Sequence, residues 1–150
     1  MNSQSTEQIP QPIYILQVLL SSEYVLFFKT RNYHWNIIGP TFYQLHLLFQ
    51  EQYTKIDELA DRIAERIRQY GYSSPGSCNE FTKLSLLTES DGVLVHATDS
   101  LTQLYKDHTT LADYINQIPS GFFDRATETL IGDVQDFHYK QSWFLRSLLE

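Results

Sequence analysis

Residues 42–70, FYQLHLLFQEQYTKIDELADRIAERIRQY, decide the fold class of this chain. Apolar side chains recur there every three or four residues without a break, at Phe42, Leu45, Phe49, Tyr53, Ile56, Ala60, Ile63 and Ile67. This spacing places them on one face of an α-helix, and Gly71 ends the pattern. We therefore expect one long amphipathic helix, which must bury its apolar stripe against other elements.

A second helix is expected immediately before this one. Apolar residues recur at helical spacing from Ile13 to Asn36, and Gly39-Pro40 then breaks the chain. Glycine is typical of a helix end, and proline suits the first turn of the next helix. Because the connection is so short, the two helices must lie antiparallel.

Two further helices complete the predicted bundle. Residues 71–90 form a long crossover rich in Gly, Ser and Pro, in which Phe81 to Leu87 predicts one short helix. Asp91 is expected to cap the third long helix, which Pro119-Ser120-Gly121 ends, and the fourth is expected from Phe122 to Leu149. A long crossover allows the third helix to run parallel to the second. No run of alternating polarity predicts a strand.

The expected fold class is therefore all-α, a ferritin-like four-helix bundle with a short helix in the long crossover between helices two and three. Residues 13–150 form the bundle domain, and residues 1–12 form a flexible N-terminal arm. A chain of 150 residues has room for one domain of this kind.

The composition excludes several classes of protein. Hydrophobic residues make up 42% and aromatic residues 14%, which is too rich for a disordered chain. The longest uninterrupted apolar run is Tyr24 to Phe28, so we expect no membrane span, and the polar first dozen residues show no secretory signal. The single cysteine, Cys78, suits a reducing compartment. A cytoplasmic protein is the expectation.

The charge of the chain counts against a surface built for nucleic acid. The net charge is −7, and no basic residue precedes Lys29. Surfaces that bind phosphate backbones need clustered Lys and Arg, often on an arm or tail. We therefore expect DNA binding to be weak or absent.

Histidine and carboxylate groups carry the candidate chemistry, because phosphate-binding loops, zinc-type cysteine pairs and Gly-x-Ser-x-Gly elbows are missing from the sequence. His34 and His46 flank the Gly39-Pro40 turn, whereas Asp57, Asp61 and Glu65 recur every four residues along the second helix. His46 and Asp61 are fifteen residues apart, which is roughly 22 Å along a helix. If both bind one ion, the carboxylates must come from another chain.

A two-fold pairing of chains meets this requirement twice per dimer, because an isologous interface repeats every contact. Imidazole and carboxylate without thiolate suit Fe(II), with Zn or Mn as competitors. No His follows a Glu by three residues, so an intrachain di-iron site of the Glu-x-x-His type is not expected.

These residues also carry a family resemblance. The motifs concerned are Tyr33-His34-Trp35-Asn36, Gly39-Pro40, Phe42, Leu45-His46, Asp61-Arg62-Ile63-Ala64-Glu65-Arg66-Ile67 and Trp143-Phe144-Leu145. They resemble the signature of the Dps family, the mini-ferritins named as DNA-binding proteins from starved cells. The resemblance covers nearly the whole chain from the first helix onward.

The resemblance implies a hollow dodecamer with ferroxidase centres between subunits. Such centres oxidise Fe(II) to Fe(III), preferably with hydrogen peroxide rather than O2, and the cage stores the ferric mineral and protects DNA from oxidative damage. By motif position, His34 and His46 are ligands from one subunit, and Asp61 and Glu65 come from its two-fold mate. The sequence departs from the family pattern at Gln50, where an acidic residue is common, and this puts a second iron position in question.

Two other functions stay open at this point. One is an architectural DNA-binding protein that compacts the chromosome without a basic tail, with Arg62, Arg66 and Arg68 as a possible patch. The other is a helical interaction module whose candidate metal ligands have no function. For the arginines, compensation of the helix dipole is the competing interpretation.

Other residues have two interpretations each. Asp57 is expected at the surface or lining a cavity, and His96, His108 and His138 at the surface or in packing. Asp124 and Glu128 either line an iron-entry pore or compensate the dipole of the fourth helix. Trp35, Tyr33 and Tyr53 either exchange electrons beside the iron or pack an interface.

Overall fold

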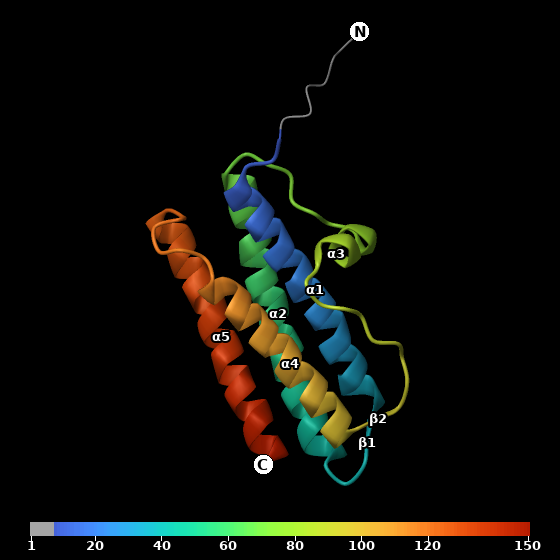
Figure 1. The fold of residues 1–150 in the computed structure, drawn as a ribbon. Coiled ribbons are helices and arrows are strands. Elements are labelled where there is room, and N and C mark those ends of the chain that lie inside the picture. Colours follow the sequence, from blue (N-terminus) through green and yellow to red (C-terminus); the bar gives the residue numbers. More distant parts are fainter. Residues whose placement is uncertain (1–7) are drawn as a thin grey trace.

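The structure of the protein is a computed structural model that describes residues 8–150. Its elements are α1 (Gln11–Asn36), β1 (Ile37–Ile38), α2 (Phe42–Gln69), α3 (Cys78–Leu84), β2 (Val95–His96), α4 (Ala97–Asn116) and α5 (Arg125–Leu149). The four long helices form a bundle, and α3 lies in the crossover beside α1 (Figure 1). The predicted all-α four-helix bundle is confirmed. Of the predicted N-terminal arm, residues 1–7 lie outside the described residues.

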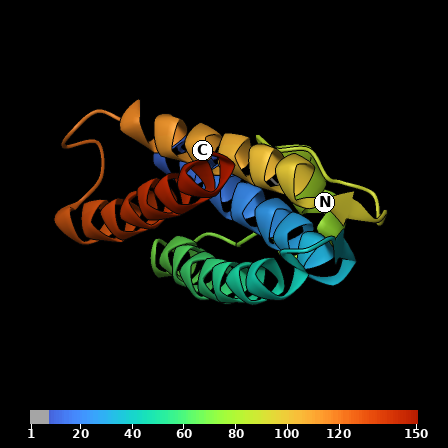
Figure 2. The same cartoon turned by 90° about the horizontal axis from the view of Figure 1, so that it is seen from below.

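The bundle is built from two antiparallel helix pairs. α1 packs mainly against α2, and α4 packs mainly against α5. Figure 2, in which the bundle is seen from below, shows the two pairs. α2 and α4 run in the same direction, as the long crossover predicts (Figure 1).

The α1–α2 turn closely follows the sequence prediction. Gly39 has a φ of 117°, a conformation that favours glycine, and α2 begins at Phe42 as expected. α1 begins at Gln11, two residues before Ile13, because Pro12 fits the first turn of a helix.

Two helix starts differ from the prediction because side-chain caps fix them. α3 begins at Cys78 instead of Phe81, since Ser77 and Glu80 form a capping box in which each side chain accepts a hydrogen bond from the other residue's backbone N–H. α5 begins at Arg125 instead of Phe122, since the carboxylate of Asp124 accepts a hydrogen bond from the N–H of Thr127 at 2.9 Å.

The predicted cap at Asp91 is wrong, and so is the prediction of no strand. Val95 and His96 pair in parallel with Ile37 and Ile38, so α4 starts only at Ala97. The carbonyl oxygen of Asp91 instead accepts a hydrogen bond from the side-chain amide of Asn32 at 3.0 Å. This long-range pairing ties the crossover to the C-terminal end of α1.

The apolar core contains residues from every helix. Phe49, Leu16, Ile56, Leu104 and Leu111 are among its fully buried side chains. Among the described helices, α1 alone is long and apolar enough to cross a membrane by length and composition. Its most apolar window is 72% buried inside the bundle, as is typical of a core helix.

Candidate metal centre

His34 and His46 face each other across the α1–α2 turn. Their rings stack with centroids 3.8 Å apart and planes 14° from parallel. The Nδ1 of His34 lies 2.6 Å from the carbonyl oxygen of His46, and the Nδ1 of His46 lies 2.7 Å from the carbonyl oxygen of His34. Two side chains twelve residues apart are thus fixed by a reciprocal pair of hydrogen bonds.

This reciprocal pair determines which ring nitrogens remain as ligands. A carbonyl oxygen only accepts hydrogen bonds, so each Nδ1 must carry the proton and donate. In the neutral imidazole, Nε2 then holds the lone pair that binds a metal ion. Burial lowers the pKa of His34, which keeps its ring neutral at pH 7. Both histidines are therefore oriented and, in this tautomer, ready to ligate.

The carboxylates lie farther along the same unbroken helix. Asp61 and Glu65 are exposed on α2, and the helix rise separates Asp61 from His46 by roughly 22 Å. Across residues 8–150, no three His, Cys, Asp or Glu side chains come together as a metal site. The structure thus brings the two predicted histidine ligands together and leaves the two predicted acidic ligands apart from them. Any site that uses all four needs a second chain.

Aromatic rings surround the histidine pair. Tyr53 meets the ring of His34 edge to face at a centroid distance of 5.2 Å, and Phe42 stacks on His46 at 5.1 Å. Trp35 is 61% exposed and lies under the guanidinium of Arg31, 4.7 Å from its ring centroid. Of the three predicted aromatics, Tyr53 therefore touches the site directly.

Tyr33 has a structural role. It is buried, and its hydroxyl lies 3.0 Å from that of Ser90 in the crossover. This contact joins the end of α1 to the segment that precedes β2.

Comparison with known proteins identifies the family. The ferritin family model, a ferritin-like domain, matches residues 13–150. A low temperature-induced protein of Nostoc sp. is 35% identical over 96% of this chain and 83% of the relative. The DNA protection during starvation protein of Helicobacter pylori is 28% identical over 90% of this chain and 96% of the relative. The crystal structure of the Dps protein from Vibrio cholerae O1, a member of a broad superfamily of ferritin-like diiron-carboxylate proteins, is 27% identical, has a TM-score of 0.84 and matches over 100% of both chains.

The chain is a member of the Dps family. This confirms the resemblance drawn from the sequence and the ferritin-like character of the bundle. Membership of a ferritin-like diiron-carboxylate superfamily supports iron binding and storage, and the Dps relatives imply a homo-oligomeric cage.

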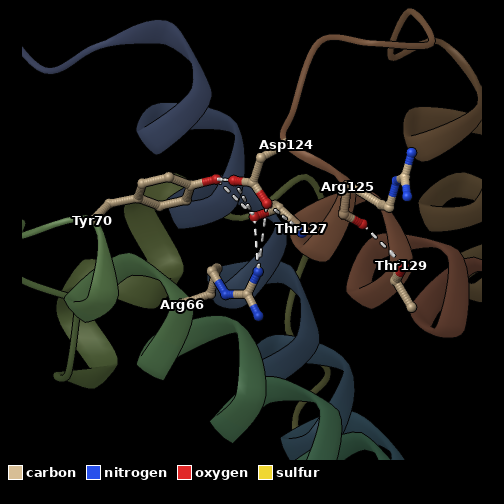
Figure 3. Close-up of polar contacts among 6 residues, drawn as sticks. All are labelled: Arg66, Tyr70, Asp124, Arg125, Thr127 and Thr129. Carbon is tan, nitrogen blue, oxygen red and sulfur yellow. Dashed lines mark hydrogen bonds and ion pairs between the residues drawn. The ribbon is translucent and has the colours of Figure 1, made fainter.

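In this Dps chain, both acidic groups at the start of α5 accept hydrogen bonds from other residues of the chain. Figure 3 shows the phenol of Tyr70 and the hydroxyl of Thr127 converging on the carboxylate of Asp124. These hydrogen bonds, with that of Tyr70 the largest effect, lower the pKa of Asp124 to about 2. Glu128 accepts a hydrogen bond from the N–H of Gly121 at 2.5 Å. Both groups thus stabilise the helix start; the pore interpretation stays a prediction.

The three arginines near the end of α2 have partners within the chain. Arg62 forms an ion pair with Asp133 at 2.8 Å, Arg66 donates to the hydroxyl of Thr127 at 3.0 Å, and Arg68 donates to a carbonyl oxygen at 2.8 Å. Figure 3 includes the Arg66 contact. These engagements favour the structural interpretation over a phosphate-binding patch.

Sequence reasoning missed a buried polar network in the bundle. The Nε2 of His138 lies 2.7 Å from a carboxylate oxygen of Glu23, and its Nδ1 lies 2.9 Å from the Nδ1 of His108. All three side chains are fully buried, so the packing interpretation of the two histidines is confirmed, whereas His96 is exposed. The available signal was Glu23 itself, a charged residue within the apolar pattern of the first helix.

Sequence reasoning also missed the contact of Asp57 with Tyr24. This exposed carboxylate accepts a hydrogen bond from the phenol of Tyr24 on α1 at 3.2 Å. Asp57 lies one turn before Asp61, so Tyr24 stands beside the acidic stretch of α2.

Proposed function

We propose that this protein is a cytoplasmic iron-storage and detoxification Dps. It oxidises Fe(II), preferably with hydrogen peroxide, at ferroxidase centres between subunits, and it stores the ferric mineral inside a hollow dodecamer. The observation that carries the proposal is the reciprocal hydrogen bonding of His34 and His46, which directs both lone pairs to Nε2.

The four ligands meet only across a two-fold axis. His34 and His46 of one subunit bind Fe(II) through Nε2, and Asp61 and Glu65 of the partner subunit complete the centre. The separation of roughly 22 Å along α2 requires this exchange, and the symmetry of the dimer produces two equivalent centres. The carboxylates supply negative charge, which stabilises Fe(III) more than Fe(II) and so favours oxidation.

The reaction is balanced by two irons per peroxide. Two Fe(II) and H2O2 with two protons give two Fe(III) and two H2O. Because both electrons reach the peroxide, no free hydroxyl radical is released, and protection of DNA is chemical. The acidic charge of the chain and the internal partners of Arg62, Arg66 and Arg68 count against DNA binding as its basis.

Gln50 sets the expected occupancy of each centre. It lies exposed on α2, one turn after His46. A neutral amide is a weaker ligand for a cation than a carboxylate, so we expect one tightly bound iron per centre. Zn or Mn compete for the same nitrogen and oxygen ligands.

Crystals soaked anaerobically with Fe(II) test this proposal. Anomalous scattering is expected at the two-fold boundary, between His34 and His46 of one subunit and Asp61 and Glu65 of the partner subunit. The same soak of H34A/H46A crystals serves as the control and should show no metal there. Iron that settles away from every subunit boundary would contradict the proposal.

A further inference from the structure

An unbroken row of aromatic rings crosses each chain from its imidazole end toward its acidic stretch. The ring of Tyr53 lies 5.2 Å from that of His34, and Phe27 lies 5.7 Å from Tyr53. Tyr24 follows at 6.0 Å from Phe27, and its phenol donates a hydrogen bond to Asp57. These three distances join ring centroids.

The row has a particular meaning in the dimer proposed above. His34 and Asp61 of one chain belong to different ferroxidase centres, because each centre takes its imidazoles and its carboxylates from different subunits. Tyr53 therefore lies at one centre, whereas Tyr24, one helical turn from Asp61 through Asp57, lies toward the other. The row of Tyr53, Phe27 and Tyr24 thus runs from one centre of a dimer toward the other and ends at Asp57, one helical turn before Asp61.

A path of this kind supplies the electron that a centre with one iron lacks. Reduction of one peroxide takes two electrons, and one Fe(II) supplies one. If Gln50 leaves one iron per centre, the second electron must come from the other centre.

We propose that the Tyr53–Phe27–Tyr24 row carries an electron between the two centres, with Tyr24 as the residue that is transiently oxidised. This inference rests on the proposed function. Fe(II) at the first centre gives peroxide one electron, and Tyr24 gives the second through Phe27 and Tyr53. Fe(II) at the second centre then reduces the Tyr24 radical, so the protein returns to its starting state and two Fe(III) remain.

The proton of Tyr24 has a defined acceptor. A phenol that loses an electron must also release its proton, and the carboxylate of Asp57 lies 3.2 Å away to receive it. When Tyr24 is reduced again, the proton returns. At rest the phenol stays protonated, because burial and the neighbouring carboxylates, first Asp57, raise the pKa of Tyr24.

The other nearby aromatics fit this role less well. The guanidinium of Arg31 lies 4.7 Å from the ring centroid of Trp35 and 5.8 Å from that of Phe27, and its positive charge opposes the loss of an electron from either ring. Phe27 and the ring of Tyr53 serve as a bridge and are not themselves oxidised. The bridge therefore needs an aromatic ring at position 53 but no hydroxyl there.

Metal-free protein gives the first test. One-electron oxidation by photoexcited ruthenium tris-bipyridine with persulfate is expected to leave its longest-lived tyrosyl radical at Tyr24, observed by electron paramagnetic resonance. The Y24F variant should lose this signal. The control Y139F, which removes a half-exposed tyrosine of α5, should keep it. A signal that persists unchanged in Y24F would overturn the assignment.

Protein loaded anaerobically with one Fe(II) per subunit gives the second test. After mixing with half an equivalent of peroxide, Y24F and F27L should oxidise iron about tenfold more slowly than wild type and release hydroxyl radical to a spin trap. Y139F, which lies outside the row, should match wild type. Anaerobic Fe(II) titration should be unchanged in all three, which shows that the ligands are intact.

The outcomes separate the two proposals. If wild type oxidises iron and loses this activity in H34A/H46A, but Y24F and F27L behave as wild type, the electron path is wrong and the centre stands. If H34A/H46A retains full activity, the centre itself is wrong, and the electron path falls with it.

Discussion

The backbone of His34 holds the ring of His46 and the backbone of His46 holds the ring of His34, since each Nδ1 donates its proton to the other residue's carbonyl oxygen. The pair joins the last turn of α1 to the second turn of α2, across the turn at Gly39. Substitution of one histidine by alanine therefore leaves the hydrogen bond of the remaining ring in place, because the backbone carbonyl persists, and removes only the stacked partner ring.

Removal of both imidazoles is expected to abolish rapid iron oxidation. H34A/H46A should slow the peroxide-driven reaction by more than about a hundredfold, because the centre loses both nitrogen ligands. The matched control is H96A, which removes the exposed histidine of β2 that pairs with Ile38 of β1. Stopped-flow absorbance measures the rate, and light scattering should show the same assembly for all three proteins. Wild-type kinetics in H34A/H46A would remove these residues from the mechanism.

Complementation between two inactive chains tests whether the centre lies between subunits. H34A/H46A keeps the carboxylates, whereas D61N/E65Q keeps the imidazoles. After the two are dissociated, mixed in equal amounts and reassembled, half of the dimers are mixed and one of their two centres is intact, so about one quarter of the wild-type Fe(II) binding should return in an anaerobic titration. Each variant reassembled alone is the control. A mixture that binds no Fe(II) despite verified mixed assembly would contradict a shared centre.

The sequence predicts the helices well and their starting residues less well. Apolar periodicity places α1 and α2 within two residues of their observed ends, because α2 buries one face and α1 is buried on most of its sides. The start of α3 depends on the capping box of Ser77 and Glu80, a local signal that the apolar pattern alone overlooks. The start of α4 depends on pairing of residues 95–96 with residues 37–38, and two-residue strands show no alternation that a sequence pattern can reveal.

For the candidate site, spacing predicts which groups are near and which are far. The short turn brings His34 to His46, and the rise of α2 keeps Asp61 away. The reciprocal hydrogen bonds and the contact of Tyr24 with Asp57 depend on the packed orientation of α1 against α2. The pairing of Glu23 with His138 joins residues 115 positions apart, which periodicity within one helix cannot predict.

His108, which lies in the buried network with His138 and Glu23, should make the free energy of unfolding depend on pH. Burial holds the pKa of His108 well below 6.5, and the neighbouring imidazole of His138 lowers it further. As the pH falls below 6.5, the unfolded chain binds a proton at His108 that the folded chain does not, so the free energy of unfolding falls by up to about 1.4 kcal/mol per pH unit from this group. Urea unfolding between pH 8 and 5 measures it. H108Q should show a shallower dependence below pH 6.5, and equal slopes in both proteins would contradict the assignment.

The capping carboxylate of α5 gives the opposite case, a group whose pKa is depressed in the folded protein. Asp124 accepts hydrogen bonds from Tyr70 and from the N–H of Thr127, which lower its pKa from 3.8 to about 2. Its stabilising effect is therefore present above pH 3.8 and is lost as the pH falls toward 2.

D124A should lower the thermal midpoint at pH 7, and D124N, which retains a capping side chain, should lower it less. Y70F isolates the phenol contact, and because its cap is intact it should lose less than D124A. Calorimetry at pH 7 ranks the three variants, and equal midpoints for D124A and wild type would show that the α5 cap contributes nothing to stability.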